Sequence, residues 1–472
     1  MSSTNQNFLT YGALVSQVEQ VYYAPVATVG QTGIPVGTLY CFLGNVTGWT
    51  GNTVPVPTQD QKSIKQVFKN MFVAKEINSA DISPVIQRID WTANTVYQYY
   101  RDDIDMFAKD VNGFLINSFY VKNRYDQVFK CLWNGATNAS FNGVPSTNEP
   151  YFQPGQYGTD NIFYGNDGYK WKYIYTVDTG SKVKFMDNLW MPVPVGTQTP
   201  DTETTLGYGS IDVINIIGGG SGYDPANATI TVTVTGDGTG ATAQVNGVAN
   251  GAIQDITVLT PGSGYTYANV FFNSTTGSGA FAIAPSSPIG GHGYDPVSEL
   301  GCFNVMLSTE FNGSENTNGV DMVPTTDGNG NPIQYYQMGI LVNPTTQSTF
   351  PYPANGSIYK TTTDIVVASS TDTGFVSGET VYQGTSLATA TFTATVVSFN
   401  LASNIAHLIN TYGTPTQNQV VRGQKSGSSR TLLSVSTPDF NVGSGYISYI
   451  ENLTGIQRSS DGIEQFKVVL SY

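Results

Sequence analysis

Charged side chains are scarce in this 472-residue sequence, in which only 11% of the residues are Asp, Glu, Lys or Arg, against about 25% in an average globular protein. Disordered chains combine high charge with few aromatic residues, whereas here 12% of the residues are aromatic and 40% are apolar. The composition therefore excludes a disordered chain and predicts a folded protein. The length favours several domains, because a single hydrophobic core seldom grows beyond about 250–300 residues.

Basic residues are the rarer charged class, with 20 Lys and Arg against 34 Asp and Glu and a formal net charge of −14. A surface of that sign repels phosphate backbones, and no cluster of basic residues offsets it. We therefore expect no nucleic acid among the partners of this protein.

Cysteines and long apolar runs are also rare. The three cysteines, Cys41, Cys131 and Cys302, are scattered and odd in number, which argues against a disulfide framework and predicts assembly in a reducing cytoplasm. We expect them to be small buried apolar residues. No stretch approaches the roughly 18 apolar residues that a membrane-spanning helix needs, and the first residues lack the features of a signal peptide. We expect no membrane insertion.

Histidine occurs only twice, at His292 and His407. A zinc site needs three or four protein ligands held close together, and two histidines with three scattered cysteines do not supply them. His292 lies in a glycine-rich turn, where we expect a structural role. The sequence thus predicts neither a metal site nor a cofactor.

One segment resembles the start of a calcium-binding loop, with Asp327, Asn329 and Asn331 at alternate positions. An EF-hand loop ends in a bidentate Glu at its twelfth position, but Met338 stands there in this sequence. We therefore expect an ordinary hairpin turn.

Acidic residues concentrate at Asp102, Asp103 and Asp105. Paired carboxylates could act as acid and base on a sugar, so a hydrolase is one hypothesis for the chain. Neighbouring Asp residues in a polar loop are more often solvated, and no nucleophile elbow, phosphate-binding loop or dinucleotide fingerprint occurs. We expect a protein that is not an enzyme.

The residues that are abundant favour β-structure, because Thr, Tyr and Val suit a pleated sheet while Gly and Asn supply turns. We predict a mainly β fold with a few helices (α+β), multidomain, with a β-sandwich-like core and inserted β-rich domains. Two helices are expected. One is indicated by a weak stripe of apolar side chains over 8–22, and the other by a strong stripe of apolar side chains from Ile64 to Phe72. Thr58 would be the N-cap of the second helix. Extended segments are expected at 94–100, 114–122 and 126–133.

An internal repeat lies in the glycine- and threonine-rich middle of the chain. The motif GSGY at 220–223 is followed by GTGA at 238–241, and GSGY at 262–265 is followed by GSGA at 277–280. Each copy predicts three strands separated by two glycine turns. The expected domains are an N-terminal core region with helices and strands (1–207), the repeat insertion (208–285), an irregular segment returning to the core (286–362), a second β-rich insertion (363–436) and C-terminal core strands (437–472).

Several segments in order resemble one known family. They are 88–91 (Arg-Ile-Asp-Trp), 120–121 (Tyr-Val), 128–132 (Val-Phe-Lys-Cys-Leu), 167–173 (Asp-Gly-Tyr-Lys-Trp-Lys-Tyr) and 191–194 (Met-Pro-Val-Pro), with 39–44 and Trp49 upstream and 445–452, 457–458, Ile463 and 466–470 downstream. This series is similar to the baseplate wedge subunit of T-even-type contractile-tailed phages, of which two copies pair within each wedge. The two insertions are of the kind seen in T-even-like phages of cyanobacteria.

The resemblance implies a non-enzymatic structural component of the virion, located in the tail baseplate and assembled in the host cytoplasm. It implies a homodimer whose partners are the other wedge proteins, with tail-fibre attachment proteins as further candidates. The alternative is a host-recognition or fibre-attachment module of the virion, in which exposed Tyr and Trp side chains stack on sugars. We favour the interpretation that most aromatic residues lie in cores and interfaces.

Overall fold

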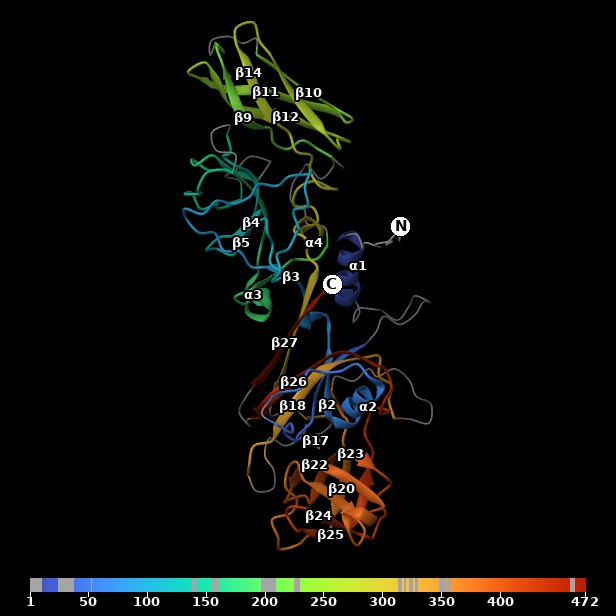
Figure 1. Cartoon of the computed structure of the whole chain (residues 1–472). Helices are drawn as coiled ribbons and strands as arrows, with labels where there is room; N and C mark the ends of the chain where they lie inside the picture. The colour runs from blue at the N-terminus through green and yellow to red at the C-terminus, as the bar shows by residue number, and fades with distance from the viewer. Residues whose placement is uncertain are drawn as a thin grey trace, which may run out of the picture. The chain divides into compact units, whose positions relative to one another are not determined.

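The protein is mainly β, as predicted, with 47% strand and 9% helix in several antiparallel sheets. Figure 1 shows the computed structural model of the chain. It describes residues 11–23, 38–51, 53–137, 142–154, 161–196, 209–224, 230–312, 316–317, 320–321, 326, 330–347, 354, 358–458 and 463–472.

The chain forms two compact units. The first comprises Met1–Glu19, Ser83–Met306 and Leu470–Tyr472, and the second comprises Gln20–Ile82 and Leu307–Val469. The region 1–207, which we expected to be one N-terminal domain, is therefore divided between them. Each unit contains one of the two expected insertions.

The first unit is built on a four-stranded antiparallel sheet in the order β4-β5-β7-β6. Its strands are β4 (Tyr120–Lys122), β5 (Gln127–Asn134), β6 (Ile162–Tyr164) and β7 (Tyr169–Thr176). The fully buried Trp171 stacks on Tyr169, with ring centroids 5.3 Å apart, and packs edge-on against Tyr97. Helix α3 (Thr179–Phe185) follows β7, and strand β8 (Trp190–Pro192) pairs with β3 (Ile82–Gln87).

The predicted strand over 126–133 is confirmed as β5, but the two extended segments before it are largely wrong. Only residues 120–122 of the segment 114–122 form a strand. The segment 94–100 has backbone N–H groups that donate to three separate stretches of chain, at Ser146, Ser118 and Cys131. A β-ladder needs one continuous partner strand, so this segment remains irregular.

The repeat forms a six-stranded antiparallel sheet within the first unit, in the order β12-β11-β10-β13-β14-β9. If β9, β10 and β11 of the first copy are exchanged with β12, β13 and β14 of the second, the same order is obtained, read from the other edge of the sheet. The two copies are therefore related as by a twofold axis between β10 and β13. The predicted three strands per copy are confirmed. They are β9 (Asn215–Ser221), β10 (Thr231–Gly236) and β11 (Thr239–Ala249), then β12 (Ala252–Ser263), β13 (Ala268–Asn273) and β14 (Ser278–Ile283).

The tyrosine of each copy of the repeat packs on the GxGA turn of the other copy. The Tyr223 hydroxyl accepts a bond from the Ala280 N–H at 3.4 Å, and the Tyr265 hydroxyl accepts one from the Ala241 N–H at 3.3 Å. Each ring lies on a glycine of the opposite copy, so that a Cβ on Gly277 would stand 2.4 Å from Tyr223 Cγ. The first glycine of each GxGA turn, Gly238 or Gly277, is therefore required by the packed tyrosine.

The second unit contains a five-stranded antiparallel sheet in the order β19-β2-β1-β18-β26. Helix α2 (Gln61–Asn70) packs on it through Val67, beside Tyr40, Met71 and Phe440. The strands of this sheet are β1 (Leu39–Gly44), β2 (Met71–Ile77), β18 (Gln334–Val342), β19 (Ile358–Lys360) and β26 (Tyr446–Gln457).

Both predicted helices exist, although their ends differ from the prediction. Helix α1 spans Tyr11–Tyr23, while Phe8 of the predicted stripe lies outside the described residues. The N-cap of α2 is Asp60, whose carboxylate accepts a bond from the Ser63 N–H, and not Thr58. The Thr58 hydroxyl instead donates to Asp60 at 2.7 Å. The end of the predicted stripe, Met71 and Phe72, belongs to strand β2.

The second insertion forms a closed six-stranded barrel, in the order β20-β23-β22-β21-β24-β25. A cluster of buried apolar side chains fills it, including Phe375, Val396 and Phe399. Its strands are β20 (Thr363–Val367), β21 (Thr380–Gln383), β22 (Phe392–Asn400), β23 (Ile405–Tyr412), β24 (Val420–Gly423) and β25 (Ser429–Ser436). Because the barrel has no open edge, its backbone groups are satisfied within it.

The segment 286–362 is more regular than we expected. It contains helix α4 (Pro296–Glu299) and two nine-residue strands, β15 (Asn304–Asn312) and β18. The shorter strands β16 (Asn316–Thr317), β17 (Val320–Asp321) and β19 also fall here, and β27 (Ile463–Ser471) ends the chain. Long turn-forming stretches around 290–296 and 327–332 conceal these strands in the sequence.

Candidate functional site

A buried ionic cluster lies in the first unit, where the chain enters and leaves the repeat insertion. Lys130 of β5 contributes its ammonium group, which lies 2.8 Å from Glu299 Oε1 and 3.6 Å from the centre of the Tyr100 ring. His292 Nδ1 lies 2.8 Å from the same Glu299 oxygen, and its Nε2 lies 3.9 Å from Asp212. The cluster joins the core sheet to both ends of the insertion.

The electrostatics of the cluster follow from complete burial. The side chains of Lys130, His292 and Glu299 are at most 2% exposed. Burial disfavours the Glu299 carboxylate, but the charge of Lys130 and the bond from His292 outweigh this cost and lower its pKa to about 2. Burial and the nearby ammonium group lower the pKa of His292. His292 is therefore neutral near pH 7, and its Nδ1–H donates to Glu299, because a carboxylate can only accept.

A similar cluster lies at the start of the barrel in the second unit. Asp364 of β20 accepts a bond from His407 Nδ1 at 2.8 Å and one from the Thr362 hydroxyl at 2.7 Å, and it pairs with Lys360 at 3.0 Å. Burial opposes the charge of Asp364, but these partners hold its pKa below the ordinary value. Both histidines of the chain thus anchor an insertion, which is the structural role that we expected for His292.

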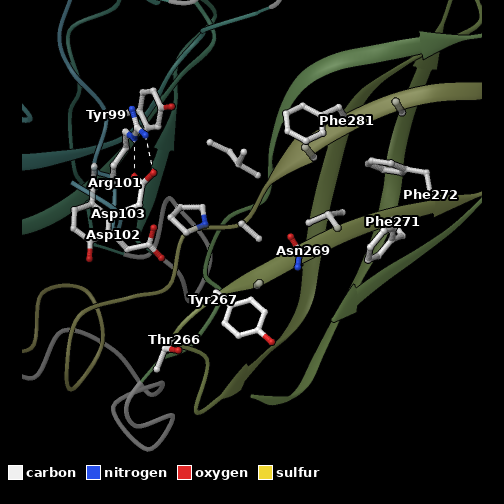
Figure 2. Close-up of a pocket in the computed structure, with 18 residues that line it drawn as sticks. Tyr99, Arg101, Asp102, Asp103, Thr266, Tyr267, Asn269, Phe271, Phe272 and Phe281 are labelled. Atoms are coloured by element: carbon white, nitrogen blue, oxygen red, sulfur yellow. Dashed lines mark hydrogen bonds and ion pairs between the residues drawn. The ribbon is translucent and has the colours of Figure 1, made fainter. Parts of the chain in front are cut away.

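A cavity of about 660 Å³ lies in the first unit between the loop 99–103 and strands β13 and β14. Figure 2 shows Tyr99, Arg101, Asp102 and Asp103 on one side of this space and Tyr267, Asn269 and Phe281 on the other. We call this cavity the groove.

The wall of the groove is the outer face of the repeat sheet. Side chains alternate across a strand, so Ala268, Val270 and Phe272 point into the core of the repeat. Asn269 and Phe271 alternate with these residues and point outward. Phe271 is 53% exposed, and Tyr267 before β13 and Phe281 of β14 are each 56% exposed. An exposed set of large rings in one cavity is unusual for a soluble surface and is typical of a binding site.

The three acidic residues singled out in the sequence have separate roles. Asp102 Oδ2 accepts bonds from the Ser286 N–H and hydroxyl at 2.8 and 2.9 Å. Asp103 pairs with Arg101 through two bonds of 2.8 and 2.7 Å, and this guanidinium lowers the pKa of Asp103. Asp105 accepts a bond from the Phe107 N–H. Asp102 and Asp103 both line the groove, whereas Asp105 does not.

A second cavity, of about 880 Å³, is lined by Lys170, Asp255 and the glycines of β9. The Lys170 ammonium group in its wall donates to the Ile214 carbonyl at 3.2 Å, and burial lowers its pKa. This lysine therefore bonds to the backbone where the chain enters the repeat insertion, and we do not regard it as a ligand-binding group.

Two further groups of residues stood out in the sequence, the segment around Asp327 and the three cysteines. Asp327 and Asn329 lie outside the described residues, although an antiparallel bridge joins Thr326 to Pro332. All three cysteines are buried and unpaired, as expected. Within the described ranges, no group of three or more His, Cys, Asp or Glu could hold a metal ion. No helix in the described part of the chain is long and apolar enough to cross a membrane.

Sequence reasoning did not identify Lys130, Glu299 or the rings of the groove. One signal was available for Lys130, which is a lone charge in the apolar run Val-Phe-Lys-Cys-Leu. A lysine in such a run predicts either an outward-facing position or a buried partner. No comparable signal marks Glu299, because a single acidic residue beside Ser298 in the short helix α4 would ordinarily be expected at the surface.

In comparisons with known proteins, no protein family model and no curated protein matches the chain.

Proposed function

We propose that this chain is a structural, non-enzymatic component of the baseplate wedge of a contractile phage tail, where it joins neighbouring wedge proteins. The observation that supports this most is the pairing of the segments that resemble the wedge subunit. In the first unit several of these segments pair directly with one another, and in the second the upstream and downstream segments are strands of one sheet, although long insertions separate them in sequence.

In the second unit, the upstream and downstream segments meet on one sheet. Strands β1 and β26 flank β18 on its two sides. The Trp49 indole N–H donates to the Leu453 carbonyl at 2.9 Å, and the Asn452 amide donates to the Pro55 carbonyl at 2.9 Å. Trp49 and Asn452 belong to the resembling series, and each bonds to a residue close in sequence to the other end of that series, so both ends lie in one folded unit.

In the first unit, the central segments also pair. Strand β5 carries the segment 128–132 and runs antiparallel to β7, which carries 167–173, so that Cys131 lies opposite Trp171. The Trp91 N–H donates to the Lys122 carbonyl at 2.8 Å, and Met191 lies opposite Ile86. The repeat and the barrel, in contrast, have sheets made only of their own strands. This is the arrangement expected of insertions into an older core.

The scarcity of charge suits a joining role. Interfaces made of aromatic and uncharged polar groups associate without relying on ion pairs that salt would screen. We further propose that the chain forms a homodimer, contacts the other wedge proteins and possesses an attachment surface for tail-fibre proteins. Its location would be the tail baseplate of the virion, after assembly in the host cytoplasm.

The proposal is tested by removing the chain during infection. Phage carrying a stop codon early in this gene should produce filled heads but no complete baseplates, and supplying the chain in trans should restore them. Sedimentation velocity of the purified chain should show a dimer at micromolar concentration. Normal contractile tails made without the chain would contradict the proposal.

A host-recognition module remains the second candidate, and one observation favours it. The exposed rings of the groove lie on the repeat insertion, outside the segments that resemble the wedge subunit. The groove therefore offers a function that the wedge role does not require.

A further inference from the structure

The two copies of the repeat differ at the surface in a way that their shared fold does not explain. In β14, Phe281 follows the GSGA turn and Ile283 lies two residues further on. At the same places after the GTGA turn, β11 of the first copy has Thr242 and Gln244. Both copies form the same strands and turns, so the fold is satisfied by polar residues at these positions.

The central strands show the same difference. Phe271 of β13 lies opposite Thr233 of β10, and the outward positions of β10 are Thr231, Thr233 and Thr235. The apolar rings are thus confined to the copy that faces the loop 99–103. Leaving a large ring half exposed to water forgoes about half of the free energy that full burial would provide. We infer that these rings are kept apolar because a ligand covers them.

Polar groups face the rings across the groove. The bonds from Ser286 fix the Asp102 carboxylate through Oδ2, and its Oδ1 has no hydrogen-bond partner among the residues that the structure describes. Asn269 lies on the same outer face as the rings, and Thr266 lines the same cavity. The groove therefore combines flat apolar faces with fixed hydrogen-bonding groups.

We propose that the groove binds a neutral carbohydrate chain. A sugar ring has an apolar C–H face, which the negative face of an aromatic ring attracts, and a rim of hydroxyl groups, which the carboxylate, amide and hydroxyl groups of the groove can bond. The cavity volume of about 660 Å³ lies in the usual range of about 300–1,000 Å³ for small-ligand sites.

The charges of the groove select against acidic sugars. Its one guanidinium, Arg101, already pairs with Asp103, so Asp102 leaves the groove with an excess negative charge. Like charges repel an acidic glycan, whereas a neutral one meets only hydrogen-bonding groups. Binding should therefore depend little on salt.

The same residues favour binding over hydrolysis. A glycosidase needs one carboxyl group that keeps its proton at working pH, which requires a raised pKa. The Arg101 guanidinium lowers the pKa of Asp103 instead, and Asp102 accepts a bond from the Ser286 backbone N–H. We therefore propose a lectin-like site.

The first step of the test is to probe a glycan array that carries neutral, amino and acidic oligosaccharides with the full-length chain. The best-bound glycan is then titrated by calorimetry at low and high salt. Phe271→Thr and Phe281→Thr place in the second copy the residue type that the first copy carries, so both variants should fold. Leu259→Thr is the matched control, since Leu259 is equally exposed, at 56%, on the same sheet but does not line the groove.

We expect binding to neutral glycans, with affinity lowered roughly three- to tenfold by each Phe variant and unchanged by the Leu259 control. Absence of binding across the array, binding restricted to acidic glycans, or equal affinity in the Phe variants would each overturn the proposal. Particles carrying Phe281→Thr should still assemble complete tails, because the groove lies outside the segments that resemble the wedge subunit. Loss of glycan binding and loss of assembly can thus be told apart. If these particles lose a virion protein instead, the groove is a protein interface and not a carbohydrate site.

Discussion

Replacing Lys130 with Met should destabilise the first unit more than any change to a surface ion pair. The substitution keeps the length and apolar stem of the side chain but leaves the Glu299 carboxylate, which is 2% exposed, without its ammonium partner. Removing one partner of a buried pair costs about 3–5 kcal/mol. In a unit of this size that corresponds to a fall of roughly 6–20 °C in the unfolding temperature.

Scanning calorimetry measures the effect, because two separate units need not unfold in one transition. Lys182→Met is the control, since Lys182 is 48% exposed where it pairs with Asp126, and such pairs contribute about 0–1 kcal/mol. The double variant Lys130→Met/Glu299→Gln removes both charges and should be more stable than Lys130→Met alone. The reasoning is refuted if Lys130→Met unfolds within 2 °C of the control.

The pH dependence provides a second readout of the cluster. The pKa of His292 is lowered in the folded state, so the unfolded chain binds more protons below about pH 6.5 and acid reduces stability there. Glu299 has a pKa of about 2 against an ordinary 4.5, so its contribution is present above pH 4.5 and is lost towards pH 2. In Lys130→Met, a protonated His292 can replace the missing ammonium group. The effect of lowering the pH from 7 to 5.5 should then reverse and become stabilising.

Three further predictions concern packing and the thiols. Gly277→Ala should destabilise the repeat by about 1–3 kcal/mol in calorimetry, because its Cβ would stand 2.4 Å from Tyr223 Cγ, whereas Gly247→Ala, whose Cβ would meet nothing closer than 3.8 Å, should be tolerated. Phe375→Ala should destabilise the barrel by about 3–5 kcal/mol, since Phe375 is fully buried, and should leave the transition of the first unit in place. The three buried thiols should not react with maleimide until the protein is denatured, because burial raises their pKa values, that of Cys302 to about 12.

The fold was predictable where the sequence pattern is local. Strict alternation and paired glycine motifs predicted the repeat, since strand period and turn glycines are properties of a few adjacent residues. The helix 61–70 was predictable for the same reason, but its end was not. Met71 and Phe72 continue the helical stripe and also begin the apolar run of β2, and pairing with β1 decides between the two.

The sites were not predictable because they depend on contacts between distant segments. Lys130 and Glu299 are 169 residues apart in sequence, and the loop 99–103 meets β13 and β14 only in the folded unit. In the run Val270-Phe271-Phe272, every residue is apolar, so alternation alone does not indicate which ring faces outward. The pairing of β13 with β10 distinguishes them, because Phe271 lies opposite Thr233 in the folded sheet.

Immunogold labelling of intact particles with an antibody to the purified chain, imaged by electron microscopy, tests the proposed baseplate role most directly. Particles treated mildly to expose hidden epitopes should be included, together with particles made without the chain as the control. We expect label confined to the baseplate end of the tail. Label along the fibres would support the recognition module instead, and virions that carry no label after disruption would contradict the account.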